Sequence, residues 1–133
     1  NATYASIFTT FSPSRLFSPI GSNVTQGLFF LPGGGEIPAT VTGFGAVLTD
    51  VDQTGPTTIR YFDALDNMLA EQVVPGSFGT GGLSFAGLLF DSPIVARIRI
   101  GTGTRVPGPD ESTDRDIVMI DDVLYGEPQR IIE

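Results

Sequence analysis

Apolar and polar residues alternate in short runs along the whole chain, and each run ends in glycine, proline or aspartate. The clearest alternation is residues 94–100, where Ile94, Ala96, Ile98 and Ile100 share one face of an extended chain and two arginines lie on the other. No stretch shows a convincing helical period. The pattern therefore predicts strands separated by turns.

The predicted strands are residues 28–31, 40–51, 57–62, 68–74, 83–90, 94–100 and the apolar part of 116–128. The pair 57–62 and 68–74 predicts a hairpin whose turn lies at residues 63–67, a segment of turn-forming residues. The run at 83–90 is apolar on both faces, which favours a central strand. Residues 1–22 are expected to form an extended N-terminal arm, or an edge strand followed by irregular chain, because Pro13 and Pro19 cannot donate to a ladder.

Length and composition bound the fold. The chain has 133 residues, which suits one domain, and 17 Gly and 10 Pro favour frequent turns. About seven or eight strands predict an all-β, jelly-roll-like antiparallel β-sandwich spanning residues 1–133. A small barrel is the alternative.

The stretch 116–128, DIVMIDDVLYGEP, contains two adjacent aspartates inside an apolar strand. Neighbouring residues of a strand point to opposite faces, so one of Asp121 and Asp122 is expected to face the interior or the rim. A buried carboxylate is costly without a partner. The question is therefore which group satisfies it.

A second acidic pair, Asp50 and Asp52, ends another predicted strand. If it meets Asp121 and Asp122 at one end of the sandwich, the four carboxylates suit a structural calcium ion, which takes six to eight oxygen ligands. The alternative is that these aspartates cap turns or pair with arginines such as Arg97 and Arg99.

The chemistry available to the chain is narrow. It contains no His, Cys or Trp, and all seven basic residues are Arg. The commonest general base and transition-metal ligand is therefore missing, and the spacing of the acids selects no catalytic pair, so a non-enzyme is expected. The net charge of −8 disfavours nucleic acid and anionic membranes as partners. No apolar run reaches the roughly 20 residues of a membrane span.

Five segments together resemble a group of uncharacterised exported bacterial proteins: FSPSRLFSPIGSNVT, PATVTGFGAVLTDVD, IRYFDALDNML, LSFAGLLF and DIVMIDDVLYGEPQ. The resemblance covers nearly the whole chain and keeps all four aspartates, although Leu48 and Leu124 stand where the group often has Phe. It implies a secreted, extracellular bacterial protein, with this chain corresponding to the C-terminal half of a longer precursor.

More distantly, the last strand is similar to that of galactose-binding-like jelly rolls and carbohydrate-binding modules. In those folds an acidic residue of the last strand commonly helps to hold structural calcium. The likeness is one of fold, from which function does not follow.

Two functional hypotheses follow for a non-catalytic domain of the cell surface or extracellular matrix. A carbohydrate-binding module would have an exposed groove containing Tyr61 or Tyr125 with polar neighbours. A self-assembling structural subunit would instead donate the first part of its N-terminal arm, residues 1–11, as a strand to another copy of itself. Glycans and copies of the same chain are thus the expected partners.

Overall fold

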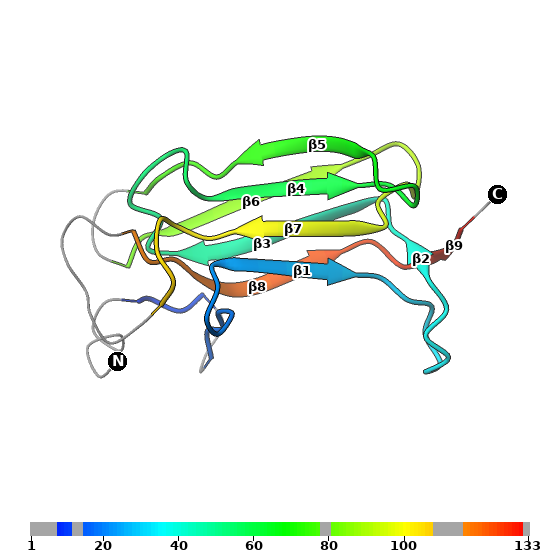
Figure 1. The fold of residues 1–133 in the computed structure, drawn as a ribbon, viewed down its shortest axis with the longest axis horizontal. Helices are drawn as coiled ribbons and strands as arrows, with labels where there is room; N and C mark the ends of the chain where they lie inside the picture. The colour runs from blue at the N-terminus through cyan, green and yellow to red at the C-terminus, as the bar shows by residue number, and fades with distance from the viewer. Residues whose placement is uncertain (1–7, 12–14, 78–80, 108–115, 132–133) are drawn as a thin grey trace.

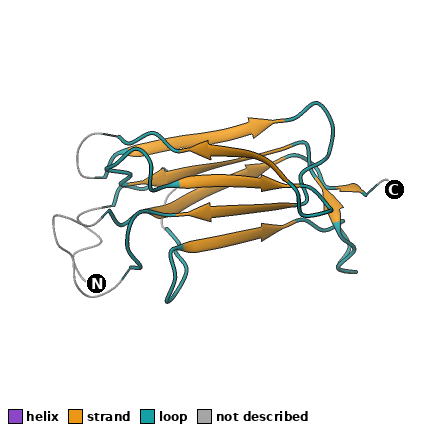
Figure 2. Cartoon of the chain, turned by 45° about the horizontal axis from the view of Figure 1, so that its top comes forward, coloured by secondary structure: helices purple, strands orange, loops and turns teal. Residues whose placement is uncertain are grey.

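The computed structural model describes residues 8–11, 15–77, 81–107 and 116–131 (Figure 1). Within these ranges the chain forms nine strands, all paired in antiparallel fashion, and no helix (Figure 2). The predicted all-β antiparallel sandwich is confirmed. No helix in the described ranges is long and apolar enough to cross a membrane.

Two sheets lie face to face (Figure 1). The four-stranded sheet has the order β1 (Val24–Leu28), β7 (Arg97–Gly101), β4 (Thr58–Phe62) and β5 (Met68–Val73). The three-stranded sheet has the order β6 (Leu83–Leu89), β3 (Gly43–Thr49) and β8 (Met119–Tyr125). A short pair, β2 (Ala39–Thr40) with β9 (Gln129–Arg130), lies at the end of the sandwich near the C-terminus (Figure 1).

The core lies between the two sheets, because alternate residues of each strand point inward. From the four-stranded sheet come Ile59 and Tyr61 on β4 and Ile98 and Ile100 on β7, and from the three-stranded sheet come Phe44, Ala46, Leu48, Ala86 and Ile120. The alternation predicted for residues 94–100 holds only from Ala96 onward. Before it, Val95 is the buried residue, and Ile94 is partly exposed.

Two predicted strands differ from the structure in their bounds. The strand expected at residues 28–31 lies earlier, at Val24–Leu28, and Leu31 instead donates its N–H to the carbonyl of Ile37 at 2.9 Å. The strand expected at 40–51 is divided into β2 and β3. Val41, between them, exchanges two hydrogen bonds with Val95, of 2.9 and 3.0 Å, which holds the chain as it passes between sheets.

The prediction that residues 83–90 form a central strand is wrong. They form β6, which is an edge strand of the three-stranded sheet. Its outward residues Leu83, Phe85 and Leu89 are exposed, whereas Ala86 faces the core. Because the outer face of β6 is also apolar, its sequence has the continuous apolar pattern of a strand that is buried on both faces.

The predicted hairpin is confirmed as β4 and β5. Its turn at residues 63–67 is closed by Asp63, whose Oδ1 accepts hydrogen bonds from the N–H groups of Leu65 and Asn67, both at 2.9 Å. A carboxylate that bonds the backbone a few residues ahead is the usual reason for aspartate in such turns.

Candidate ligand-binding cleft

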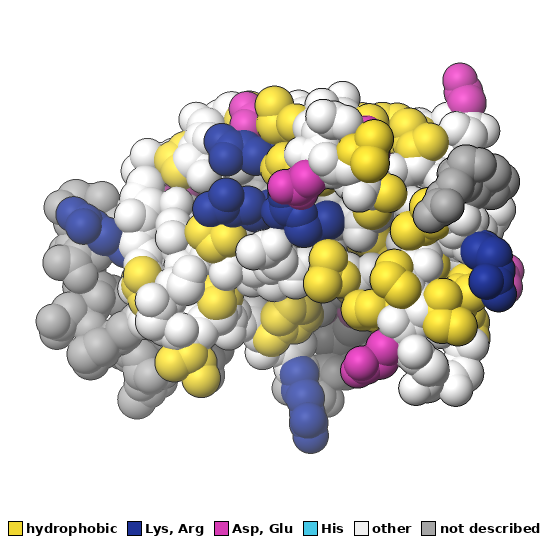
Figure 3. Space-filling model, turned by 45° about the vertical axis from the view of Figure 1, so that its right-hand side comes forward, with side chains coloured by type: hydrophobic (Ala, Val, Ile, Leu, Met, Phe, Trp, Pro, Cys, Tyr) yellow, Lys and Arg dark blue, Asp and Glu magenta, His cyan; other side chains and the backbone are white. Residues whose placement is uncertain are grey.

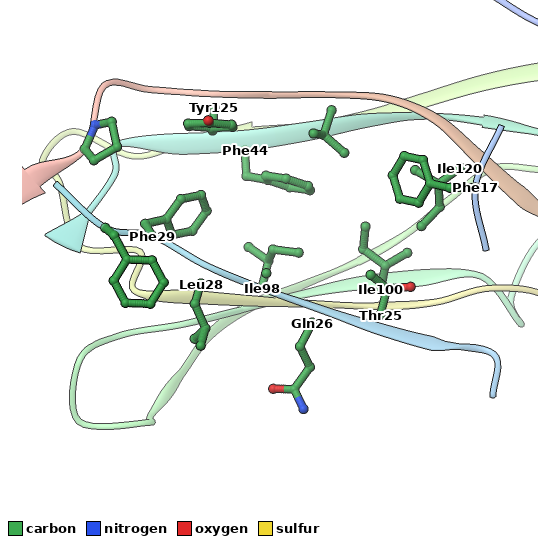
Figure 4. Close-up of a pocket in the computed structure, with 14 residues that line it drawn as sticks. Phe17, Thr25, Gln26, Leu28, Phe29, Phe44, Ile98, Ile100, Ile120 and Tyr125 are labelled. Carbon is green, nitrogen blue, oxygen red and sulfur yellow. The ribbon is translucent and has the colours of Figure 1, made fainter. Parts of the chain in front are cut away.

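The two sheets are not closed along the edge formed by β1 and β8. A cleft of about 410 Å³ enters the sandwich there, and we call it the β1–β8 cleft (Figure 4). Its lining is almost wholly apolar and consists of Phe17, Thr25, Gln26, Gly27, Leu28, Phe29, Phe30, Phe44, Ile98, Ile100, Ile120, Val123, Tyr125 and Pro128. Its volume falls within the range of small-molecule binding sites.

The two ends of the cleft differ (Figure 4). At one end Phe17 lies beside Ile120, and their backbones exchange two hydrogen bonds of 2.9 Å. At the other end Tyr125 lies against Phe29, with ring centroids 5.6 Å apart and planes inclined by 55°. The cleft is therefore elongated between two aromatic groups, and both Phe17 and Tyr125 are about half exposed.

Two features of β1 shape this space. Gly27 occupies an inward position opposite Ile98, and a Cβ there would lie only 2.9 Å from Ile98 Cδ1. The absence of a side chain at residue 27 thus keeps room for Ile98 at the base of the cleft. The Gln26 side chain points away from the cleft (Figure 4), so β1 contributes little polarity to it.

The polar exception is Thr25. Its side chain lines the cleft, but its Oγ1 is buried and has no hydrogen-bond partner among the described residues. An unpaired buried hydroxyl costs free energy that a partner would recover. The oxygen has almost no accessible surface, so a ligand in the cleft would bond to it once the Thr25 side chain turns toward the cleft.

The structure separates the two tyrosines proposed as sugar platforms. Tyr61 is fully buried, its hydroxyl donates to the carbonyl of Phe44 at 3.1 Å, and burial raises its pKa to about 12. It cannot stack on a ligand. Tyr125 is 54% exposed and lies in the cleft among apolar side chains, whereas Thr25 lies toward the other end, beside Ile100 (Figure 4). Tyr125 could be named from the sequence, but Thr25 and the phenylalanines could not, because no local pattern shows where two sheets separate.

The adjacent aspartates of β8 are placed by a β-bulge. Leu48 pairs with Ile120 and Val47 pairs with Asp122, so Asp121 is the extra residue of the bulge on β8. Ile120 faces the core, whereas Asp122 lies on the side of Val47, away from the core. Asp121 is buried and Asp122 is half buried, so the expectation that the two aspartates differ in environment is confirmed, although a bulge and not strict alternation produces the difference.

Asp121 and Asp50 are both almost fully buried, and backbone N–H groups bond to both. Asp121 Oδ2 accepts a short hydrogen bond from the N–H of Phe11. Asp50 adopts a positive φ of 68° just after β3, and its Oδ1 accepts from the N–H of Gly81 at 2.8 Å. Contacts of this kind fit the capping alternative.

The proposed calcium ligands are not gathered in the described part of the chain. Asp52 is exposed, Asp122 is half buried, and no three acidic side chains there lie close enough together to hold a metal ion. The alternative ion pairs with Arg97 and Arg99 do not form either. Those two arginines project from the outer face of the four-stranded sheet, where Arg97 bonds to Asp66.

Asp116, which sequence analysis did not single out, joins three loops at one end of the sandwich. It is fully buried, and its carboxylate accepts from the N–H groups of Asp52 and Gln53 at 3.1 and 3.4 Å. Its carbonyl accepts from Thr104 at 2.8 Å, and a Cβ on Gly103 would lie 2.0 Å from that oxygen. Desolvation raises the pKa of Asp116 above its ordinary value.

The described part of the N-terminal arm lies on its own sandwich. Thr9 donates its N–H to Thr49 Oγ1 at 3.2 Å, and Phe17 pairs with Ile120. The remainder of the proposed donor strand, residues 1–7, lies outside the described residues. Strand donation by that part stays a prediction.

Comparison with known proteins does not assign the chain to a family. No family model, no curated protein and no solved structure matches the chain. The inference about function therefore depends on the chain's own residues.

Proposed function

We propose that this domain is a non-catalytic binding module whose ligand places an apolar group in the β1–β8 cleft. One observation carries the proposal: an elongated cleft lined by aromatic and aliphatic side chains includes Thr25, whose buried hydroxyl has no partner among the residues that the structure describes. Concave apolar sites with few convergent polar groups are typical of small-molecule binding. The ligand class best suited is a molecule with an apolar chain or ring and one hydrogen-bonding group.

The lining argues against a neutral sugar as the occupant of this cleft. Each hydroxyl of a sugar needs a hydrogen bond when it leaves water. Besides Thr25, the lining supplies Gln26, whose side chain points away (Figure 4). The exposed Tyr125 could stack on one sugar ring, but its neighbours could not satisfy the remaining hydroxyls. Location outside the cell and a structural calcium ion, both expected from the sequence, belong to the same proposal.

The test is the fluorescence of N-phenyl-1-naphthylamine, an uncharged apolar probe, titrated with the protein. Val123→Trp places a large side chain at the rim, because Val123 lines the cleft and is 42% exposed. Leu124→Trp is the matched control, since Leu124 is next in sequence, exposed, and paired with Gly45 on the outward side.

The unmodified protein is expected to bind the probe, and Val123→Trp to weaken binding by about tenfold or more, equivalent to 1.4 kcal/mol. Leu124→Trp should leave the affinity within about twofold. Equal losses in the two variants, or no binding by the unmodified protein, would contradict the proposal. Circular dichroism of each variant verifies that the sandwich is intact.

A further inference from the structure

The outer face of the four-stranded sheet gathers three of the seven arginines of an acidic chain. Arg60, Arg97 and Arg99 project outward because the residues beside them, such as Ile59 and Ile98, face the core. Figure 3 shows basic side chains lying side by side on one face, with an acidic side chain among them. This surface is on the opposite side of the sheet from the β1–β8 cleft.

Four polar side chains on this face lie in one row. Gln26 pairs with Arg99, Arg99 with Arg60, and Arg60 with Glu71, so the row crosses β1, β7, β4 and β5 in register. We call these four residues the polar row. Adjacent strands are about 4.8 Å apart, and the row therefore spans about 14 Å.

The charges along the row are not balanced. Arg60 bonds to Glu71 at 2.5 Å, and Arg97 on the neighbouring row bonds to Asp66 at 2.5 Å. Arg99 makes no ion pair with any described residue, although it is exposed and stands directly opposite Arg60. Like charges opposite each other weaken a sheet. A bound anion would remove that repulsion.

We propose that the polar row binds an acidic saccharide, with the sugar carboxylate on Arg99. A guanidinium can bond a carboxylate through two parallel N–H groups, which makes this the strongest contact available on the face. Gln26 is already oriented, because its Oε1 accepts from Arg97 Nη1 at 3.2 Å, and its amide nitrogen can donate to a sugar hydroxyl. Glu71 can accept from a hydroxyl at the other end.

A saccharide suits the row better than an acidic peptide does. A uronic acid presents its carboxylate and its hydroxyls on one rigid ring, so a single ring can meet several donors and acceptors of the polar row. Carboxylates of a peptide sit on flexible stems that lose rotational freedom on binding. The net charge of −8 repels long polyanions, but screening at about 0.15 M salt limits this repulsion to roughly 8 Å. A short oligosaccharide is therefore the expected ligand.

The experiment is isothermal titration calorimetry with tetragalacturonic acid, with the neutral cellotetraose and with tetraglutamate, at about 0.15 M salt. Arg99→Gln removes the unpaired charge. Arg130→Gln is the matched control, because Arg130 is an exposed arginine on β9 and carries the same change of charge. Binding of N-phenyl-1-naphthylamine should be the same in Arg99→Gln and the unmodified protein, which separates this proposal from the one for the cleft.

We expect tetragalacturonic acid to bind, Arg99→Gln to weaken it by about tenfold or more, and Arg130→Gln to change it by less than about twofold. Cellotetraose should not bind. Three outcomes would overturn the proposal: no binding of tetragalacturonic acid, equal weakening by both arginine variants, or tetraglutamate binding as tightly with the same dependence on Arg99. The last would identify an acidic peptide as the ligand class.

Discussion

Val47 on β3 pairs with Asp122 on β8, although the preceding pair joins Leu48 to Ile120. The single residue left over, Asp121, allows an apolar strand to carry two adjacent aspartates without turning Asp122 toward the core. Beyond the bulge, Val123 and Tyr125 face the cleft. The bulge thus determines which side chains of β8 line one wall of the proposed site.

Deleting Asp121 should preserve the fold, because Ile120 and Asp122 would then pair with consecutive residues of β3. Deleting Val123 should cost more, since Leu124 would then face the cleft and Tyr125 would point away from it. We expect a loss of about 1–2 kcal/mol for the first deletion and a larger loss for the second, measured by urea unfolding. Equal losses would contradict the assignment of the bulge to Asp121.

Asp116 should matter more for stability than Asp52. Asp116→Ala would remove the buried carboxylate that accepts from the N–H groups of Asp52 and Gln53, at a cost of about 2 kcal/mol in the free energy of unfolding. Asp52→Ala changes an exposed side chain and should stay within about 0.5 kcal/mol. Denaturant unfolding of the two variants checks this, and the reverse order would contradict the contacts described for Asp116.

The calcium proposal has its own test in the same variants. If calcium is bound by Asp50, Asp52, Asp121 and Asp122, the midpoint of thermal unfolding should rise with calcium and fall with chelator, and Asp52→Ala should reduce that response. A midpoint of thermal unfolding that is the same in calcium and in chelator would contradict the binding of calcium. Capping of Gly81 by Asp50 would then be enough to explain the buried position of Asp50.

Acid should weaken the β4–β5 turn. The Asp63 carboxylate accepts hydrogen bonds from the side chain and backbone of Asn67 and from the backbone of Leu65. These bonds lower the pKa of Asp63 below its ordinary value of 3.8. Since the pKa is lower in the folded state, this stabilisation is present above pH 3.8 and is lost as the pH falls through the folded value. Carbon-13 NMR titration should give a midpoint below 3.8 that moves up in Asn67→Ala. An unchanged midpoint in that variant would contradict the cause assigned.

Thr25→Val should stabilise the free domain by about 1 kcal/mol, because it removes a buried hydroxyl that no described residue bonds. Thr102→Val is the control. The Thr102 hydroxyl donates to the carbonyl of Asn23 at 3.2 Å, so its loss should destabilise. Thermal unfolding compares the two. A loss of stability in Thr25→Val would mean that its hydroxyl has a partner in solution and is not held for a ligand.

Local chemistry in the sequence predicted some elements well. The hairpin at residues 57–74 was predictable because Asp63 and Asn67 form a turn from side chains within five residues of each other. The edge position of β6 was not, because exposed Phe85 has the same apolar character as a buried residue. Whether an apolar face is covered depends on strands distant in sequence.

The candidate site was harder to predict than the fold. Tyr125 was named from its residue type, but the cleft exists because β1 and β8 lie at neighbouring edges of two different sheets (Figure 1). Similarly, the polar row depends on the register among four strands. The sequence therefore predicted that Arg97 and Arg99 share a face, but not which residues of the neighbouring strands lie beside them. Asp116 is joined to Asp52 across 64 residues, a separation that no motif spans.

The most direct test of the proposed cleft is carbon-13 methyl NMR of the isoleucines and leucines during titration with N-phenyl-1-naphthylamine. Ile98, Ile100 and Ile120 line the cleft, whereas Ile59 is equally buried but lies outside the lining. The account predicts that the methyl signals of the first three shift on binding and that those of Ile59 do not. Shifts confined to leucines of the outer face of β6, or no shift at saturating probe, would contradict it.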